Sequence, residues 1–118
     1  MCGIAGIALL DKARPIQRGW IESMCDQLVH RGPDDSGVFI DGDVALGSRR
    51  LAIQDTSLAG HMPMASPNGE AIISLNGEIY NFREIRKDLE KSSGSRFRSN
   101  TDTEYERRVA LCVVVQRR

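Results

Sequence analysis

The second residue of this chain is a cysteine that directly follows the initiator methionine. Removal of Met1 would leave Cys2 with both a thiol and a free α-amine. An α-amine has a pKa of about 7.7 to 8.0 and a thiol one of about 8.5, so near neutral pH the amine can accept the thiol proton at little cost. Such a nucleophile needs neither a histidine nor an aspartate. The alternative is that Cys2 is a small apolar residue in a buried strand, the common role of a free cysteine.

Further segments downstream carry recognisable patterns in a fixed order. With the opening they are residues 1–6 (MCGIAG), 30–37 (HRGPDDSG), 50–53 (RLAI), 60–61 (GH) with 63–64 (PM), 75–86 (LNGEIYNFREIR) and 101–104 (TDTE). Together they resemble the glutaminase domain of glutamine-hydrolysing asparagine synthetases, from residue 1 to about residue 104. Amidotransferases that make glucosamine phosphate or phosphoribosylamine share the Cys-Gly-Ile opening. The segments RGPD and NGEIYN are similar to the asparagine synthetase branch.

This resemblance implies a fold and a reaction. The fold is α+β, of the N-terminal-nucleophile amidotransferase type, with antiparallel sheets in a four-layer αββα sandwich that is incomplete here. The reaction is hydrolysis of L-glutamine to glutamate and ammonia through a thioester on Cys2. Residues 1–104 would form the N-terminal part of a type 2 glutamine amidotransferase domain, followed by a divergent tail at 105–118. The synthetase domain would be absent, and with it the ammonia acceptor site, ATP and magnesium, so no cofactor is expected in this chain.

The resemblance also implies the residues of a glutamine pocket. The corresponding positions here are Arg50, Ile53, Asn76, Gly77, Glu78 and Asp102. The Asn76 side-chain amide and the Gly77 N–H would stabilise the oxyanion, and one such donor is worth about 3 to 4 kcal/mol in the transition state. Arg50 would clasp the α-carboxylate with its planar fork, and Glu78 and Asp102 would receive the α-ammonium. The alternatives are an ordinary Asn-Gly turn and surface salt bridges.

Other polar residues are assigned smaller roles. His30 and Arg31 are expected to brace their loop, and His61 has a still weaker claim to function. The pair Asp34-Asp35 is not a metal site without further ligands. Two positions depart from the family, because Ser48 stands where many relatives have histidine and Gln54 replaces an aliphatic residue.

The elements that must position these residues follow from periodicity and turn signals. Strands are predicted over residues 2–10, 38–40, 44–46 and 71–75, with a hairpin at Asp41-Gly42-Asp43. A polar loop is predicted at 30–37 and a long loop from 55 to 69. A helix is predicted after Pro15, with Trp20 and the methionines in the core, and a shorter helix begins at Phe82 and ends near Ser92 to Gly94. A final helix could begin at 100–103, but the β-branched residues 113–115 leave its end uncertain.

Composition limits the remaining possibilities. The 118 residues suit one domain, and sixteen basic and sixteen acidic residues give no global attraction to nucleic acid or a membrane. Three scattered cysteines favour reduced thiols and a cytoplasmic location, and the apolar start is too short to span a membrane. Because the resemblance stops after Glu104, we expect a truncated chain that is either a glutaminase or a silent remnant binding at most glutamine or a partner. A homo-oligomer and a complementing second chain stay open.

Overall fold

A computed structural model describes most of the chain. The described residues are 2–11, 14–53, 57–66, 68–94, 96–97, 102 and 112–116. Met1, Gln54, and the residues 100, 101, 103 and 104 of the expected final helix start lie outside them. Within the described part the structure contains two α-helices and two three-stranded antiparallel sheets, which confirms the α+β class with antiparallel sheets.

The first sheet has the strand order β1-β3-β2. Its strands are β1 (Gly3–Ala8), β2 (Asp35–Asp41) and β3 (Val44–Arg50). β2 and β3 form the predicted hairpin, in which Gly42 adopts a positive φ of 58°, a conformation that glycine accepts without steric cost. β3 is central, pairing Arg49 with Gly3 on one side and Arg50 with Asp35 on the other.

Helix α1 (Arg18–Asp26) covers one face of this sheet. Its Ile21 and Cys25 are fully buried and pack in a cluster with Ala5, Ile16 and Ala45. Gly47 lies under the helix, where a Cβ would collide with the Cys25 sulfur. Full burial of an isoleucine contributes about 1.5–3 kcal/mol, so this contact anchors the first sheet to α1.

The prediction that Trp20 and the methionines lie in the core is wrong for two of these residues. Trp20 is 42% exposed and Met24 is 41% exposed, whereas Met62 is buried. The apolar stripe on α1 is wide enough for two helical faces, and the face carrying Ile21 and Cys25 is the one that meets the sheet.

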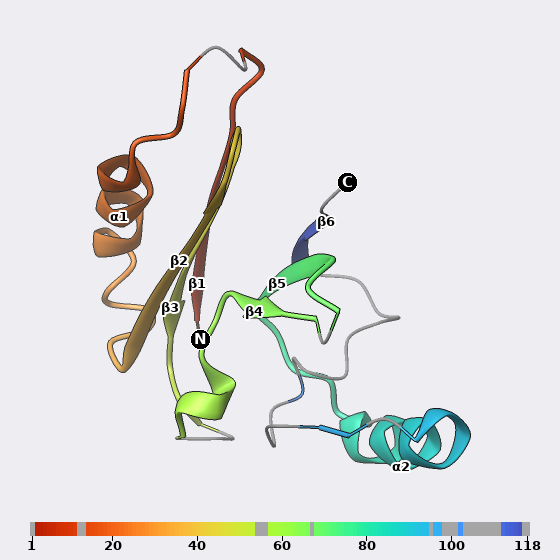
Figure 1. The fold of residues 1–118 in the computed structure, drawn as a ribbon. Coiled ribbons are helices and arrows are strands. Elements are labelled where there is room, and N and C mark those ends of the chain that lie inside the picture. The colour runs from red at the N-terminus through yellow and green to blue at the C-terminus, as the bar shows by residue number, and fades with distance from the viewer. Residues whose placement is uncertain are drawn as a thin grey trace.

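The second sheet has the order β4-β5-β6. It consists of β4 (Met64–Ala65), β5 (Ala71–Leu75) and β6 (Cys112–Gln116), and β4 follows the short 3-10 helix η1 (Leu58–Gly60). Figure 1 shows this sheet on the side of the first sheet away from α1, and β5 contacts β3. The sequence predicted a final helix whose end was left uncertain by the β-branched residues 113–115. Residues 112–116 form a strand, as expected for β-branched residues.

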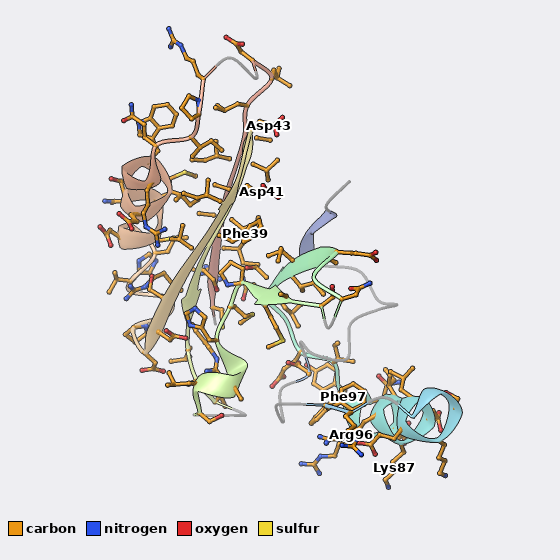
Figure 2. All side chains as sticks on the ribbon, viewed as in Figure 1. Phe39, Asp41, Asp43, Lys87, Arg96 and Phe97 are labelled. Carbon is orange, nitrogen blue, oxygen red and sulfur yellow. The ribbon has the colours of Figure 1, made fainter. Side chains whose placement is uncertain are left out.

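Helix α2 (Phe82–Ser93) follows β5 and ends at Gly94, which has a left-handed conformation. Its position and end agree with the prediction. Figure 1 shows α2 beyond the second sheet, at the opposite end of the molecule from the β2–β3 turn. Figure 2 shows Phe97 beside α2, where the Arg86 guanidinium lies 5.3 Å from the centre of its ring. Neither helix of the described chain has the length and apolar character needed to cross a membrane.

Candidate active site

Cys2 extends β1 at the end of the first sheet. Continuing the pairing of Gly3 with Arg49 by one residue sets Cys2 beside Arg50. Side chains alternate along a strand, and Gly3 faces Leu28, which packs against the core on the α1 side of the sheet, so the Cys2 side chain points toward the second sheet. Its sulfur accepts a hydrogen bond from the Leu51 N–H at 3.4 Å and lies 3.9 Å from the Leu51 carbonyl oxygen. The thiol is therefore half-buried and held against the main chain at the end of β3.

The loop before β2 is tied to the same place. The Arg31 Nε donates to the carbonyl oxygen of Cys2 at 3.1 Å, and the Arg49 Nε donates to the carbonyl oxygen of Gly32 at 3.0 Å. The Asp34 carboxylate accepts from the Ala52 N–H at 2.8 Å. These bonds cross between residues that lie far apart in the sequence, so the loop fixes the main chain on both sides of the Cys2 sulfur. Arg31 was expected only to brace its loop, but it also holds the main chain of Cys2.

Arg50 closes β3, as predicted, and is 5% exposed. Its Nη1 donates to the carbonyl oxygen of Ser57 at 3.1 Å. A guanidinium carries five N–H donors in a planar fork, a geometry that suits a carboxylate. Arg50 and Cys2 thus lie on neighbouring strands at the same end of the first sheet.

The second group of predicted residues follows β5. Asn76 and Gly77 form the turn that leaves the strand, and Glu78 is exposed beyond them. The Asp102 carboxylate, 6% exposed, accepts from the Ile79 N–H at 2.9 Å. A residue distant in sequence is thereby joined to the main chain directly after the Asn-Gly turn.

Ile53 contributes no buried side chain to either group. Its side chain is 71% exposed, which leaves only its main chain for contact with a ligand. The predicted residues thus form two sets: Cys2 and Arg50 on the first sheet, and the Asn76–Glu78 segment with Asp102 after β5.

The two sets are connected through residues that sequence reasoning did not select. The Met62 sulfur accepts from the Leu75 N–H at 3.4 Å, immediately before Asn76. The Met62 main chain lies on Gly37 of β2, where a side chain would collide with it. The His61 Nδ1 lies 2.8 Å from the Asp35 carboxylate. The segment at 61–62 therefore joins the first sheet to β5. The glycine at position 37 is the sequence feature that permits the Met62 main chain to approach β2 so closely.

Burial distinguishes Cys25 from Cys2. Cys25 is 1% exposed, and burial raises the pKa of its thiol; nearby Asp26 and Glu22 act in the same direction, while Arg49 opposes them. A thiol with a raised pKa is a poor nucleophile near neutral pH. The half-buried Cys2 is therefore the better candidate for covalent chemistry. No group of three or more histidine, cysteine or acidic side chains able to hold a metal ion occurs among the described residues.

Comparison with known proteins identifies the class. Residues 1–110 match the family model described as a glutamine amidotransferase domain, and the chain belongs to this family. Its relatives are asparagine synthetases that hydrolyse glutamine. The chain is 38% identical over 109 residues to asparagine synthetase [glutamine-hydrolyzing] 1 of Bacillus subtilis, covering 88% of this chain and 16% of the relative.

Plant relatives give the same result. The chain is 38% identical over 104 residues to asparagine synthetase [glutamine-hydrolyzing] of Sandersonia aurantiaca, covering 88% of this chain and 19% of the relative. It is 35% identical over 104 residues to asparagine synthetase [glutamine-hydrolyzing] 1 of Arabidopsis thaliana, covering 88% and 17%. The chain therefore spans less than a fifth of the length of these curated relatives, and the resemblance noted in the sequence is confirmed for this region.

Proposed function

We propose that this chain binds L-glutamine and hydrolyses it to glutamate and ammonia, with Cys2 as the nucleophile. The observation that carries the proposal is the half-buried Cys2 sulfur, held against the Leu51 main chain beside the buried Arg50. This arrangement supports a thiol that is fixed in direction next to a cation able to hold an amino acid carboxylate.

The proposed reaction has two steps. In the first, the α-amine of the processed Cys2 takes the thiol proton and the sulfur attacks the amide carbon of glutamine. The Asn76 amide and the Gly77 N–H donate to the oxyanion, and collapse of the intermediate breaks the C–N bond. The leaving nitrogen takes the proton from the α-amine and departs as ammonia. In the second step, water adds its oxygen to the thioester carbon, the C–S bond breaks, and a proton returns to sulfur.

Substrate binding is proposed to use the charged residues around the two sets. Arg50 pairs with the α-carboxylate, and Glu78 and Asp102 receive the α-ammonium. The main chain at Ile53 completes the pocket. Asp102 has a partly fixed orientation already, because one carboxylate oxygen accepts from the Ile79 N–H.

We infer the context of this reaction from the relatives. The relatives are named as asparagine synthetases that hydrolyse glutamine. For this chain we propose a type 2 amidotransferase region at 1–104 and a divergent tail at 105–118, acting in the cytoplasm where thiols stay reduced. ATP, magnesium and the ammonia acceptor would belong to a synthetase domain outside this sequence, and no cofactor is assigned here. A second copy or a complementing chain is the proposed partner.

The alternative function is a silent remnant that binds glutamine or a partner without turnover. One observation favours it: no described side chain of α2 is fully buried, and this helix begins five residues after Gly77 of the proposed oxyanion turn. A turn without firm support would bind substrate but stabilise the transition state poorly.

Covalent labelling tests the proposed function. The full chain is incubated with a glutamine analogue that carries an electrophilic diazoketone in place of the amide, and intact mass is measured. We expect one adduct on the chain lacking Met1, the same adduct on Cys25→Ala, and none on Cys2→Ala. Equal labelling of Cys2→Ala, or no adduct on a chain from which Met1 has been removed, would contradict the nucleophile assignment.

Ligand-dependent unfolding separates the enzyme from the remnant. A midpoint raised by glutamine together with ammonia release supports the enzyme, and a raised midpoint without ammonia release supports the remnant. Cys2→Ala is the matched control, because it should retain the midpoint shift and lose ammonia release.

A further inference from the structure

Two buried hydroxyl groups lie behind the proposed glutamine site. Ser48 is 1% exposed and Ser74 is 0% exposed. Neither Oγ has a hydrogen-bond partner in the described part of the chain. Burying a hydroxyl without a partner destabilises the fold, and native proteins satisfy the large majority of such groups. Two such groups in one small protein therefore require an explanation.

Both serines occupy equivalent positions relative to the site. Ser48 lies two residues before Arg50 on β3, and Ser74 lies two residues before Asn76 on β5. Because side chains two apart on a strand share a face, Ser48 lies on the same face of β3 as Arg50, whereas Ser74 lies on the strand that leads into Asn76. The pair thus spans the two sets of residues that the proposed chemistry must bring together.

The Ser48 hydroxyl lies on the face of the first sheet that is turned away from α1. Its neighbour Gly47 faces the helix, so Ser48 faces the opposite side. The register places Gly37 beside Ser48 and Phe39 beside Leu46, and Figure 2 shows Phe39 on the side of the sheet away from α1. β3 contacts β5, the strand that carries Ser74. The two hydroxyls are therefore carried by two touching strands of different sheets.

We propose that Ser48 and Ser74 are positioning residues whose hydroxyls share one buried water between β3 and β5. A hydroxyl offers one donor and two acceptors, and a buried water needs two to four polar partners, which two hydroxyls begin to supply. The water would fix β3 against β5 and thereby set the Arg50 guanidinium relative to the Asn76 amide. The positioning role rests on the proposed function, whereas the water bridge itself does not.

A double-mutant cycle tests the bridge. Ser48→Ala, Ser74→Ala and the double variant of the full chain are unfolded in urea, with Ser36→Ala as a control because Ser36 is an exposed serine of the same sheet. We expect each single variant to raise the unfolding equilibrium constant roughly tenfold, and the double variant to be little less stable than either single one, since the second serine has then already lost its partner. Single variants at least as stable as the parent chain, or strictly additive losses, would overturn the bridge.

Kinetics test the positioning role. Because Asn76 acts in the transition state, we expect kcat for ammonia release to fall about tenfold in each alanine variant, with KM changed less than threefold. Ser48→Thr keeps the hydroxyl and should recover most of kcat. Coupled unfolding with an unchanged kcat would overturn the positioning role alone. A parent chain without turnover would overturn the proposed function and this role, while the unfolding cycle would still decide the bridge.

Discussion

Asp102 carries two tasks that substitution can separate. Its carboxylate accepts from the Ile79 N–H at 2.9 Å within a 6% exposed side chain, and we propose that it also receives the glutamine α-ammonium. Asp102→Asn keeps a carbonyl oxygen for the Ile79 N–H but removes the charge. Asp102→Ala removes both. The two variants should therefore differ in stability and agree in their loss of substrate affinity.

The expected magnitudes follow from the hydrogen bonds. Asp102→Ala leaves a shielded N–H without its acceptor, so the free energy of unfolding should fall by about 1–3 kcal/mol. Asp102→Asn replaces a charge-assisted bond with a neutral one and should cost about 1 kcal/mol or less. Loss of the ammonium contact, worth about 1.5–3 kcal/mol, should weaken glutamine binding roughly 10- to 150-fold in both variants.

Urea unfolding and calorimetric titration with glutamine provide the assay. Glutamine affinity unchanged in Asp102→Asn would refute the ammonium contact, even if the alanine variant is unstable. Equal stability of Asp102→Ala and the parent chain would refute the structural bond to Ile79. Glu78→Gln serves as the comparison, because Glu78 is exposed and should affect glutamine affinity with little effect on unfolding.

Three further outcomes can be measured by unfolding alone. Burial raises the folded-state pKa of the Cys25 thiol. Its contribution to stability should therefore be complete below the unfolded thiol pKa of about 8.5 and be lost as pH rises from there through the folded pKa. Cys25→Ala should flatten this part of the plot of unfolding free energy against pH, and an unchanged slope would contradict the argument. Ile21→Ala removes a fully buried side chain and should cost about 2–5 kcal/mol in urea. Gly19→Ala should raise the urea midpoint of unfolding, because Gly19 lies in a helix with open space at its Cβ position. Gly42→Ala should lower this midpoint, because Gly42 has a φ of 58°. Equal shifts would show that backbone conformation does not determine the effect of these two substitutions.

Local sequence patterns predicted those elements whose structure depends on a few adjacent residues. The Asp-Gly pair predicted the β2–β3 hairpin, and Gly94 predicted the end of α2. Both features arise from backbone preferences of a few adjacent residues, so distant contacts do not change them.

Elements that depend on tertiary pairing were predicted less well. Asp35, Ser36 and Gly37 were expected in a loop because of their composition, yet they begin β2 because β3 pairs with them. The same pairing determines which face of α1 is buried, and this leaves Trp20 half exposed.

For the candidate site, residue types were predictable but their connections were not. The family resemblance named Asp102, whereas its bond to Ile79 joins residues 23 positions apart. The Arg31 bond to the Cys2 carbonyl crosses 29 positions. Long-range hydrogen bonds of this kind depend on how strands and loops are brought together, and a linear pattern does not encode them directly.

The uneven burial of the two helices has a consequence for local opening. α1 seals Ile21 and Cys25 against the first sheet, while the side chains described for α2 are at most half-buried. Amide hydrogens in β3 should therefore exchange with solvent only when most of the fold unfolds, and those in α2 should exchange through local unfolding. Since α2 begins five residues after Gly77, local unfolding of α2 would loosen the turn after β5 while Cys2 and Arg50 stay in place.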